Sequence, residues 1–170
     1  MKKQGFTLIE LMVVIVIMGI LAAVAVPKLF GMIAKSKASE VGPAAGEYVK
    51  LQDAFISESG TTWGSWKYIG YNMTSNTNLK YYETGTENGT GSATTATLGS
   101  VTTTDPWKAQ PATALNECKT GGYWKINIAL ATSGNGAAYT VSTTTNCNVL
   151  VPGVGKLDAT GAATIAADPS

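Results

Sequence analysis

The sequence contains no histidine and no arginine, and these two absences limit its chemistry. Histidine is the commonest general base and metal ligand in proteins, and arginine is the usual bidentate partner of phosphate and carboxylate groups. Charge is also scarce: the formal net charge is +1, and the 14% of charged residues form no basic stripe. We therefore expect no catalytic residue, no metal site, no cofactor and no nucleic acid partner.

Cysteine is limited to Cys118 and Cys147, both far beyond an apolar N-terminal segment. If that segment directs the rest of the chain outward, both thiols reach an oxidising compartment, where we expect them to pair. A redox site would need a close C-x-x-C pair, and a metal site would need more ligands. The interpretation is a structural disulfide that closes a loop of about 30 residues.

The apolar segment, residues 6–27, carries a single charge, at Glu10. As a helix, its first 21 residues or so span about 31 Å, which matches a hydrocarbon core of about 30 Å. Lys2 and Lys3 precede it, and the positive-inside rule keeps such an end in the cytoplasm. We predict one membrane-spanning helix over residues 6–27.

An ordinary secretory signal peptide is the alternative, because Ala23-Val24-Ala25 resembles a cleavage site. Two features argue against it. A glutamate near the start of the apolar run gives a signal peptide no advantage. The run also continues past Pro27 into further helix-compatible sequence, where a cleaved peptide would give way to a polar start.

Glu10 needs a physical reason to lie in this segment. An acidic residue at the bilayer centre costs roughly 2.5–3.5 kcal/mol, and less near an interface. An ionisable residue in a membrane segment is by default a functional hypothesis. The alternative is that the Glu10 side chain extends to the lipid headgroups and has no functional role.

The stretch KKQGFTLIELMVVIVIMGILAAVAVP, residues 2–27, resembles the class III leader and N-terminal helix of type IV pilins and of the related type II secretion pseudopilins. The resemblance is specific over about the first 30 residues. It implies a leader peptide at residues 1–5, cleavage after Gly5 by a prepilin peptidase and N-methylation of Phe6. It also implies retention in the inner membrane, with the N-terminus cytoplasmic, until assembly machinery extrudes the subunit into an extracellular filament.

The resemblance gives Glu10 a partner. Cleavage after Gly5 creates an ammonium group on Phe6, which methylation leaves basic. In a bundle of identical helices, Glu10 of one subunit neutralises Phe6 of its neighbour, and such a pair fixes the axial register that a wholly apolar helix would leave free. The chain's main partner is then itself.

The helix is predicted to continue to residue 57. Five apolar residues recur at helical spacing on one face: Val41, Ala44, Tyr48, Leu51 and Phe55. Pro27 removes a backbone donor and Gly19 is a second weak point, so this part either bends or, as the family suggests, loosens when the subunit leaves the membrane. Gly42-Pro43 predicts a second bend.

Residues 58–170 are predicted to form a β-rich head that covers the apolar face of the helix, an α+β fold. Tyr123–Ala131 and Tyr139–Ser142 alternate as an antiparallel hairpin. Residues 84–104 are predicted to be an exposed loop. Further strands are expected in Val149–Val151 and in Lys156–Ile165, and Trp66–Tyr71 is either a strand or a packed loop.

Asp105-Pro106-Trp107 resembles a stretch that precedes a calcium-binding loop in major pseudopilins. Lys108 follows where that family has glycine, and three scattered downstream carboxylates do not indicate a site that needs six to eight oxygens. We expect a turn with a buried Trp107.

The sequence therefore predicts the structural subunit of a type IV pilus. The alternative is a pseudopilin of a type II secretion system, which shares the mode of assembly. A membrane-anchored hydrolase would need a signature around its serine and lysine residues, and none is present.

Overall fold

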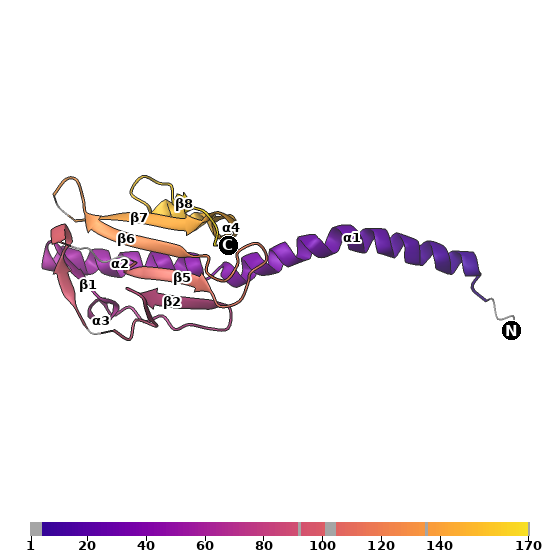
Figure 1. Ribbon diagram of the computed structural model, residues 1–170, viewed down its shortest axis with the longest axis horizontal. Helices are drawn as coiled ribbons and strands as arrows, with labels where there is room; N and C mark the ends of the chain where they lie inside the picture. Colours follow the sequence, from indigo (N-terminus) through magenta and orange to yellow (C-terminus); the bar gives the residue numbers. More distant parts are fainter. Residues whose placement is uncertain (1–4, 92, 101–104, 135, 170) are drawn as a thin grey trace.

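The computed structural model describes residues 5–91, 93–100, 105–134 and 136–169, and it consists of a long N-terminal helix and a β-rich head (Figure 1). The predicted α+β fold is confirmed. The helical part comprises α1 (Leu8–Ala38) and α2 (Val41–Ser59). The head contains β1 (Thr62–Gly64), α3 (Trp66–Ile69), β2 (Leu79–Glu83), β3 (Thr86–Glu87), β4 (Thr95–Thr97), η1 (Leu98–Ser100), β5 (Trp107–Pro111), β6 (Trp124–Leu130), β7 (Ala137–Thr144), α4 (Thr145–Leu150), η2 (Pro152–Leu157) and β8 (Thr164–Ala166).

The long helix is interrupted by a turn at Ser39 and Glu40, just before the bend predicted at Gly42-Pro43. Pro43 has no amide hydrogen, so the carbonyl of Ser39 lacks its helical donor, and the proline ring crowds that carbonyl. Tyr81 and Asn76 donate hydrogen bonds to the Glu40 carboxylate at 2.8 Å and 2.6 Å. The junction between α1 and α2 is therefore tied to the head.

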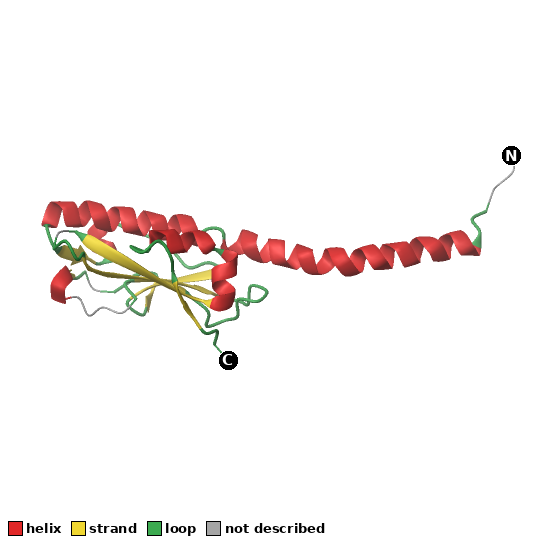
Figure 2. Ribbon diagram, turned by 90° about the horizontal axis from the view of Figure 1, so that it is seen from above, coloured by secondary structure: helices red, strands yellow, loops and turns green. Residues whose placement is uncertain are grey.

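Six strands form the main sheet, in the order β3-β2-β5-β6-β7-β8. Neighbouring strands are antiparallel except for β7 and β8, which run parallel. The predicted hairpin is confirmed as β6 and β7, with Ile126 opposite Val141 and Ile128 opposite Tyr139. Figure 2 shows α2 lying along one face of the strands. The core of the head lies between that helix and the sheet.

The buried face of α2 is rotated slightly from the predicted one. Leu51 and Phe55 are only half-buried, whereas Gln52 is fully buried. The Gln52 amide donates a hydrogen bond to the carbonyl of Gly64, and the Gly64 amide donates to Gln52 Oε1 at 3.4 Å. Gln52 thus satisfies the backbone of β1, which explains a polar side chain in an otherwise apolar face.

Replacing Gln52 by leucine is expected to destabilise the head although it preserves volume and adds apolar surface. Two buried backbone groups of Gly64 would lose their partner, and each such loss costs about 1–3 kcal/mol. Chemical denaturation of the detergent-solubilised chain measures the effect. Gln110→Leu, on the outer face of β5, is the matched control and should change the free energy of unfolding little. Equal stability of the two variants would contradict the role of Gln52.

Other parts of the head differ from the sequence prediction. Trp66–Tyr71 begins with the short helix α3, and Val149-Leu150 ends a helix where a strand was expected, because short apolar runs do not distinguish the two. In Lys156–Ile165 only the last two residues belong to a strand. The expected loop at 84–104 contains β3, β4 and a buried Leu98, although residues 92 and 101–104 lie outside the described part.

Candidate functional site

The largest exposed apolar surface belongs to α1. This helix has 31 residues, of which only Ala34 and Ala38 are buried. It extends away from the head along the long axis of the molecule (Figure 1). Within the described residues, the helical segment Leu8–Ser59 is long and apolar enough to cross a membrane. Such a helix needs either lipid or other helices around it.

Glu10 lies at the third position of α1 and closes a capping box with Thr7. Its Oε2 atom accepts hydrogen bonds from the Thr7 backbone amide at 2.8 Å and from the Thr7 hydroxyl at 2.7 Å. The Glu10 amide donates in return to Thr7 Oγ1 at 3.4 Å. Among the described residues, the hydrogen bonds of the Glu10 carboxylate all reach Oε2. Its second oxygen therefore remains available to a group from outside the chain.

The sequence prediction missed this local role, although the pattern T-x-x-E at residues 7–10 is the known signature of a capping box. The box starts the helix at Leu8 rather than at Phe6. Phe6 is 88% exposed. Residues 1–4 of the predicted leader lie outside the described residues, which begin at Gly5.

Gly19 and Pro27, the two predicted weak points, both lie inside α1, which continues through them without a break. A β-carbon built at Gly19 would meet nothing within 4 Å. Packing within this chain therefore does not require glycine at that position. Pro27 leaves the carbonyl of Ala23 without its helical donor.

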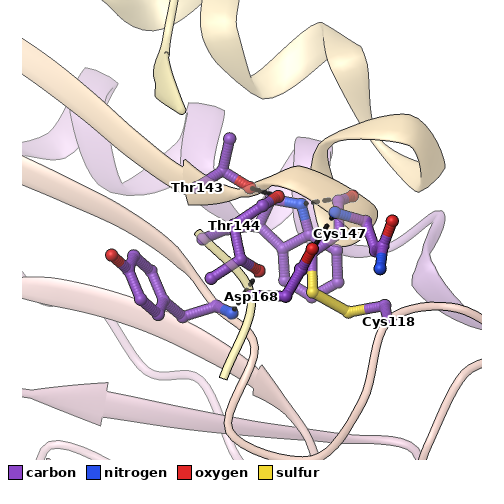
Figure 3. Close-up of a disulfide and its surroundings, with 8 residues drawn as sticks. Cys118, Thr143, Thr144, Cys147 and Asp168 are labelled. Atoms are coloured by element: carbon purple, nitrogen blue, oxygen red, sulfur yellow. Dashed lines mark hydrogen bonds between the residues drawn. A yellow bond between two sulfur atoms is a disulfide. The ribbon is translucent and has the colours of Figure 1, made fainter. Parts of the chain in front are cut away.

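The predicted disulfide is confirmed between Cys118 and Cys147, which are 29 positions apart and fully buried (Figure 3). It joins the loop before β6 to helix α4. The Trp124 indole donates a hydrogen bond to the carbonyl of Cys147 at 3.1 Å. A β-carbon at Gly122 would collide with the Cys147 sulfur, so only glycine fits beside the bridge. The bridge is thus part of the packed core of the head.

The loop held by this disulfide also contacts α1 where the helix enters the head. Ala114, Leu115 and Asn116 border a groove whose other wall includes Phe30 and Ile33 of α1. The C-terminal end of α4 lies beside the same part of the helix, with Val149 exposed. The disulfide therefore stabilises the base of the head, next to the exposed helix.

The Asp105-Pro106-Trp107 stretch has the geometry of a structural turn. The Asp105 carboxylate pairs with Lys125 at 2.9 Å, and the Asp105 amide donates to Asn127 Oδ1 at 3.0 Å. Trp107 is fully buried, as predicted, and its indole donates to the Tyr71 hydroxyl at 2.9 Å. The described residues contain no group of three or more histidine, cysteine or acidic side chains that could hold a metal ion.

Comparison with known proteins adds to this geometry. A family model described as the prokaryotic N-terminal methylation motif matches residues 1–26. The type IV major pilin protein PilA of Myxococcus xanthus (strain DK1622) is 46% identical over 57 residues, which cover 34% of this chain and 26% of that protein. The fimbrial protein EcpC of Eikenella corrodens is 45% identical over 58 residues, or 34% of this chain and 38% of EcpC. These two matches thus span well under half of each relative.

A longer match extends into the head. The type IV major fimbrial protein FimA of Dichelobacter nodosus (strain VCS1703A) is 34% identical over 134 residues, which cover 78% of this chain and 71% of that protein. No solved structure matches the chain.

Proposed function

The chain belongs to the type IV pilins, which are structural subunits and not enzymes, and from this premise we propose that it is processed after Gly5 and assembled through α1 into a filament on the cell surface. The pseudopilin alternative is not favoured, because the matched relatives are named pilins and fimbrial proteins. In this proposal the filament is a helical homopolymer. Prepilin peptidase and the assembly machinery of the inner membrane act on the subunit before it leaves the cell.

The observation that carries this proposal is the exposed apolar length of α1, in which only Ala34 and Ala38 are buried. Fully burying a side chain such as valine, leucine or isoleucine contributes about 1.5–3 kcal/mol. The helix therefore partitions into the bilayer first, with residues 6–27 spanning it. In the filament, the helices of other subunits replace the lipid.

Within the filament, Glu10 is proposed to pair with the Phe6 ammonium of a neighbouring subunit. The free Oε1 atom of Glu10 supports this, because the capping box with Thr7 engages only Oε2. The ammonium exists only after cleavage, so processing and assembly are coupled. Gly19 and Pro27 are proposed to let α1 loosen as the subunit leaves the membrane, since a β-carbon at Gly19 would meet nothing within 4 Å and Pro27 is exposed and removes one helical hydrogen bond.

The mature chain is expected to begin at Phe6 with a methylated amino group. N-terminal sequencing or intact mass of the membrane-bound subunit measures this. Gly5→Leu is the matched variant: a β-carbon at Gly5 meets nothing within 4 Å, so the head should fold normally while cleavage is blocked. A mature chain that begins near Val26 would instead indicate an ordinary secretory signal peptide.

Shearing of surface filaments tests the function itself. The sheared fraction should contain this subunit as its main component, detected by an antibody to the head, and electron microscopy should show thin filaments that disappear when the gene is deleted. If the subunit remains in the membrane and no filament contains it, the proposal is wrong.

A further inference from the structure

Charge is distributed unevenly along the exposed faces of the two helices. Lys28 and Lys35 of α1 are seven residues apart, and Glu47 and Glu58 of α2 are eleven residues apart. Rotation by about 100° per residue places the members of each pair within about 20° of one another around the helix. All four side chains are exposed. We call the first pair the basic stripe and the second pair the acidic stripe.

These charges have no ionic partner within the chain. Among the described residues, the salt bridges are Lys80–Glu87 and Lys125–Asp105, and both lie in the head. Residues 11–39 contain three lysines and no acidic residue. Glu117 borders the same hollow as Lys35 but forms no ion pair with it. The basic stripe is therefore free to pair with another molecule.

The acidic stripe lies outside the buried face of α2, which includes Ala44, Tyr48 and Ile56. Lys50 is the one basic residue of α2, and Asp53 accepts a hydrogen bond from the Tyr139 hydroxyl at 2.7 Å, so Asp53 is held against the head. Glu47 and Glu58 are both exposed, so a second helix can reach their carboxylates.

We propose that the basic stripe of one subunit faces the acidic stripe of another subunit in the filament, a contact that rests on the proposed function. Lys28 is 19 residues from Glu47, and Lys35 is 23 residues from Glu58. At 1.5 Å per residue these separations are about 28 and about 35 Å, so parallel helices at an axial offset of about 30 Å bring each lysine within about 5 Å of its glutamate along the axis, a gap that the long side chains can bridge. The partner is therefore a second copy of this chain, displaced by about that distance.

The physical role of this contact is to select one offset. Apolar helix surfaces attract one another at many axial positions, and the proposed Glu10 contact anchors only the N-terminal end. A single exposed ion pair is weak, but this one repeats at every subunit. An offset near zero would place lysines beside lysines, which is unfavourable.

Lipid headgroups explain only part of the basic stripe. Lys28 lies at the end of the proposed membrane span and can reach the headgroups before extrusion. Lys35 lies eight residues beyond Pro27, about 12 Å further along the helix. The headgroup region adds only about 5–8 Å on each side of the hydrocarbon core. Lys35 therefore lies beyond the membrane surface, where another subunit is the available partner.

A charge exchange tests the contact in cells that make filaments with the wild-type chain. Reversal of the basic stripe (Lys28→Glu with Lys35→Glu) should lower sheared filaments at least tenfold, and so should reversal of the acidic stripe (Glu47→Lys with Glu58→Lys). Combining all four changes should restore at least half of the wild-type amount. Lys67→Glu, an exposed lysine of α3, is the matched control and should leave filaments unchanged.

Immunoblots of the membrane fraction must show similar amounts of every subunit, so that misfolding is excluded. Near-normal filaments from either reversed stripe would overturn the contact, as would a four-residue exchange that restores nothing. Loss of membrane retention on reversal of the basic stripe alone, without rescue by the exchange, would assign that stripe to lipid headgroups instead. Absence of filaments from the wild-type chain would refute the proposed function and not this contact alone.

Discussion

Replacing Glu10 by alanine is expected to yield a stable subunit that is cleaved after Gly5 and stays in the membrane but forms few or no filaments. In the proposed filament, the change removes the partner of the neighbouring Phe6 ammonium, and loss of one member of a buried ion pair costs about 3–5 kcal/mol. This cost recurs at every subunit. The head is remote from α1's first turn, so its fold and disulfide should be unaffected. Electron microscopy beside a membrane immunoblot measures both effects.

Glu10 has a local role in the capping box as well as the proposed intersubunit role, so the control variants must separate the two. Glu10→Gln preserves the capping pattern but not the charge, and it should be nearly as defective as alanine. Glu10→Asp keeps the charge and should retain part of the function. Thr7→Val removes the capping hydroxyl and leaves the charge, so it should cost helix stability of about 0.5–2 kcal/mol but preserve assembly.

Normal filaments from Glu10→Gln, together with loss of filaments from Thr7→Val, would show that capping alone explains Glu10. Normal filaments from Glu10→Ala would show that assembly needs neither the capping box nor the proposed pair with Phe6.

Loss of the disulfide is the second large effect that we expect. Cys118→Ser opens a loop closed across 29 positions, which in the chain-entropy model contributes about 3–4 kcal/mol. It also places a hydroxyl group at a fully buried position and leaves the Cys147 thiol without its partner. Subunit abundance should fall, and thermal unfolding of the detergent-solubilised chain should occur at a lower temperature.

The double variant Cys118→Ala with Cys147→Ala separates the bridge from the buried hydroxyl. It should retain most of the destabilisation, because the lost cross-link is the larger effect. Alkylation under denaturing, non-reducing conditions should label neither cysteine in native material. Labelling of both thiols would show that the bridge is absent from the native protein.

Sequence reasoning predicted the features that depend on long patterns. The apolar run of residues 6–27 and the alternation in β6 are clear in the amino-acid order, and the confinement of cysteine to two positions made the pairing of Cys118 with Cys147 the natural prediction. Each of these depends on composition or on local periodicity, which the sequence displays directly.

The missed features depend on contacts between distant residues. In the sequence, Gln52 reads as a surface residue of a helix. Its burial is explained only by its hydrogen bonds to the backbone of Gly64, which is 12 residues further along the chain. In Leu79–Glu83 the buried residues alternate as in a strand, but the last buried residue is the acidic Glu83. The Glu83 carboxyl group accepts a hydrogen bond from the Trp66 amide at 2.5 Å. Burial raises the pKa of the Glu83 carboxyl. A buried acid is rare, so the pattern did not indicate a strand.

The central claim is that the chain forms a filament held together by packed α1 helices, with Glu10 neutralising the terminus of a neighbour. A near-atomic reconstruction of the sheared filament tests it most directly. We expect α1 helices at the core, the chain beginning at Phe6, and the Glu10 carboxylate within about 4 Å of the amino nitrogen of a neighbouring Phe6. A filament in which Glu10 contacts only its own Thr7, with no neighbouring amine near it, would contradict the claim.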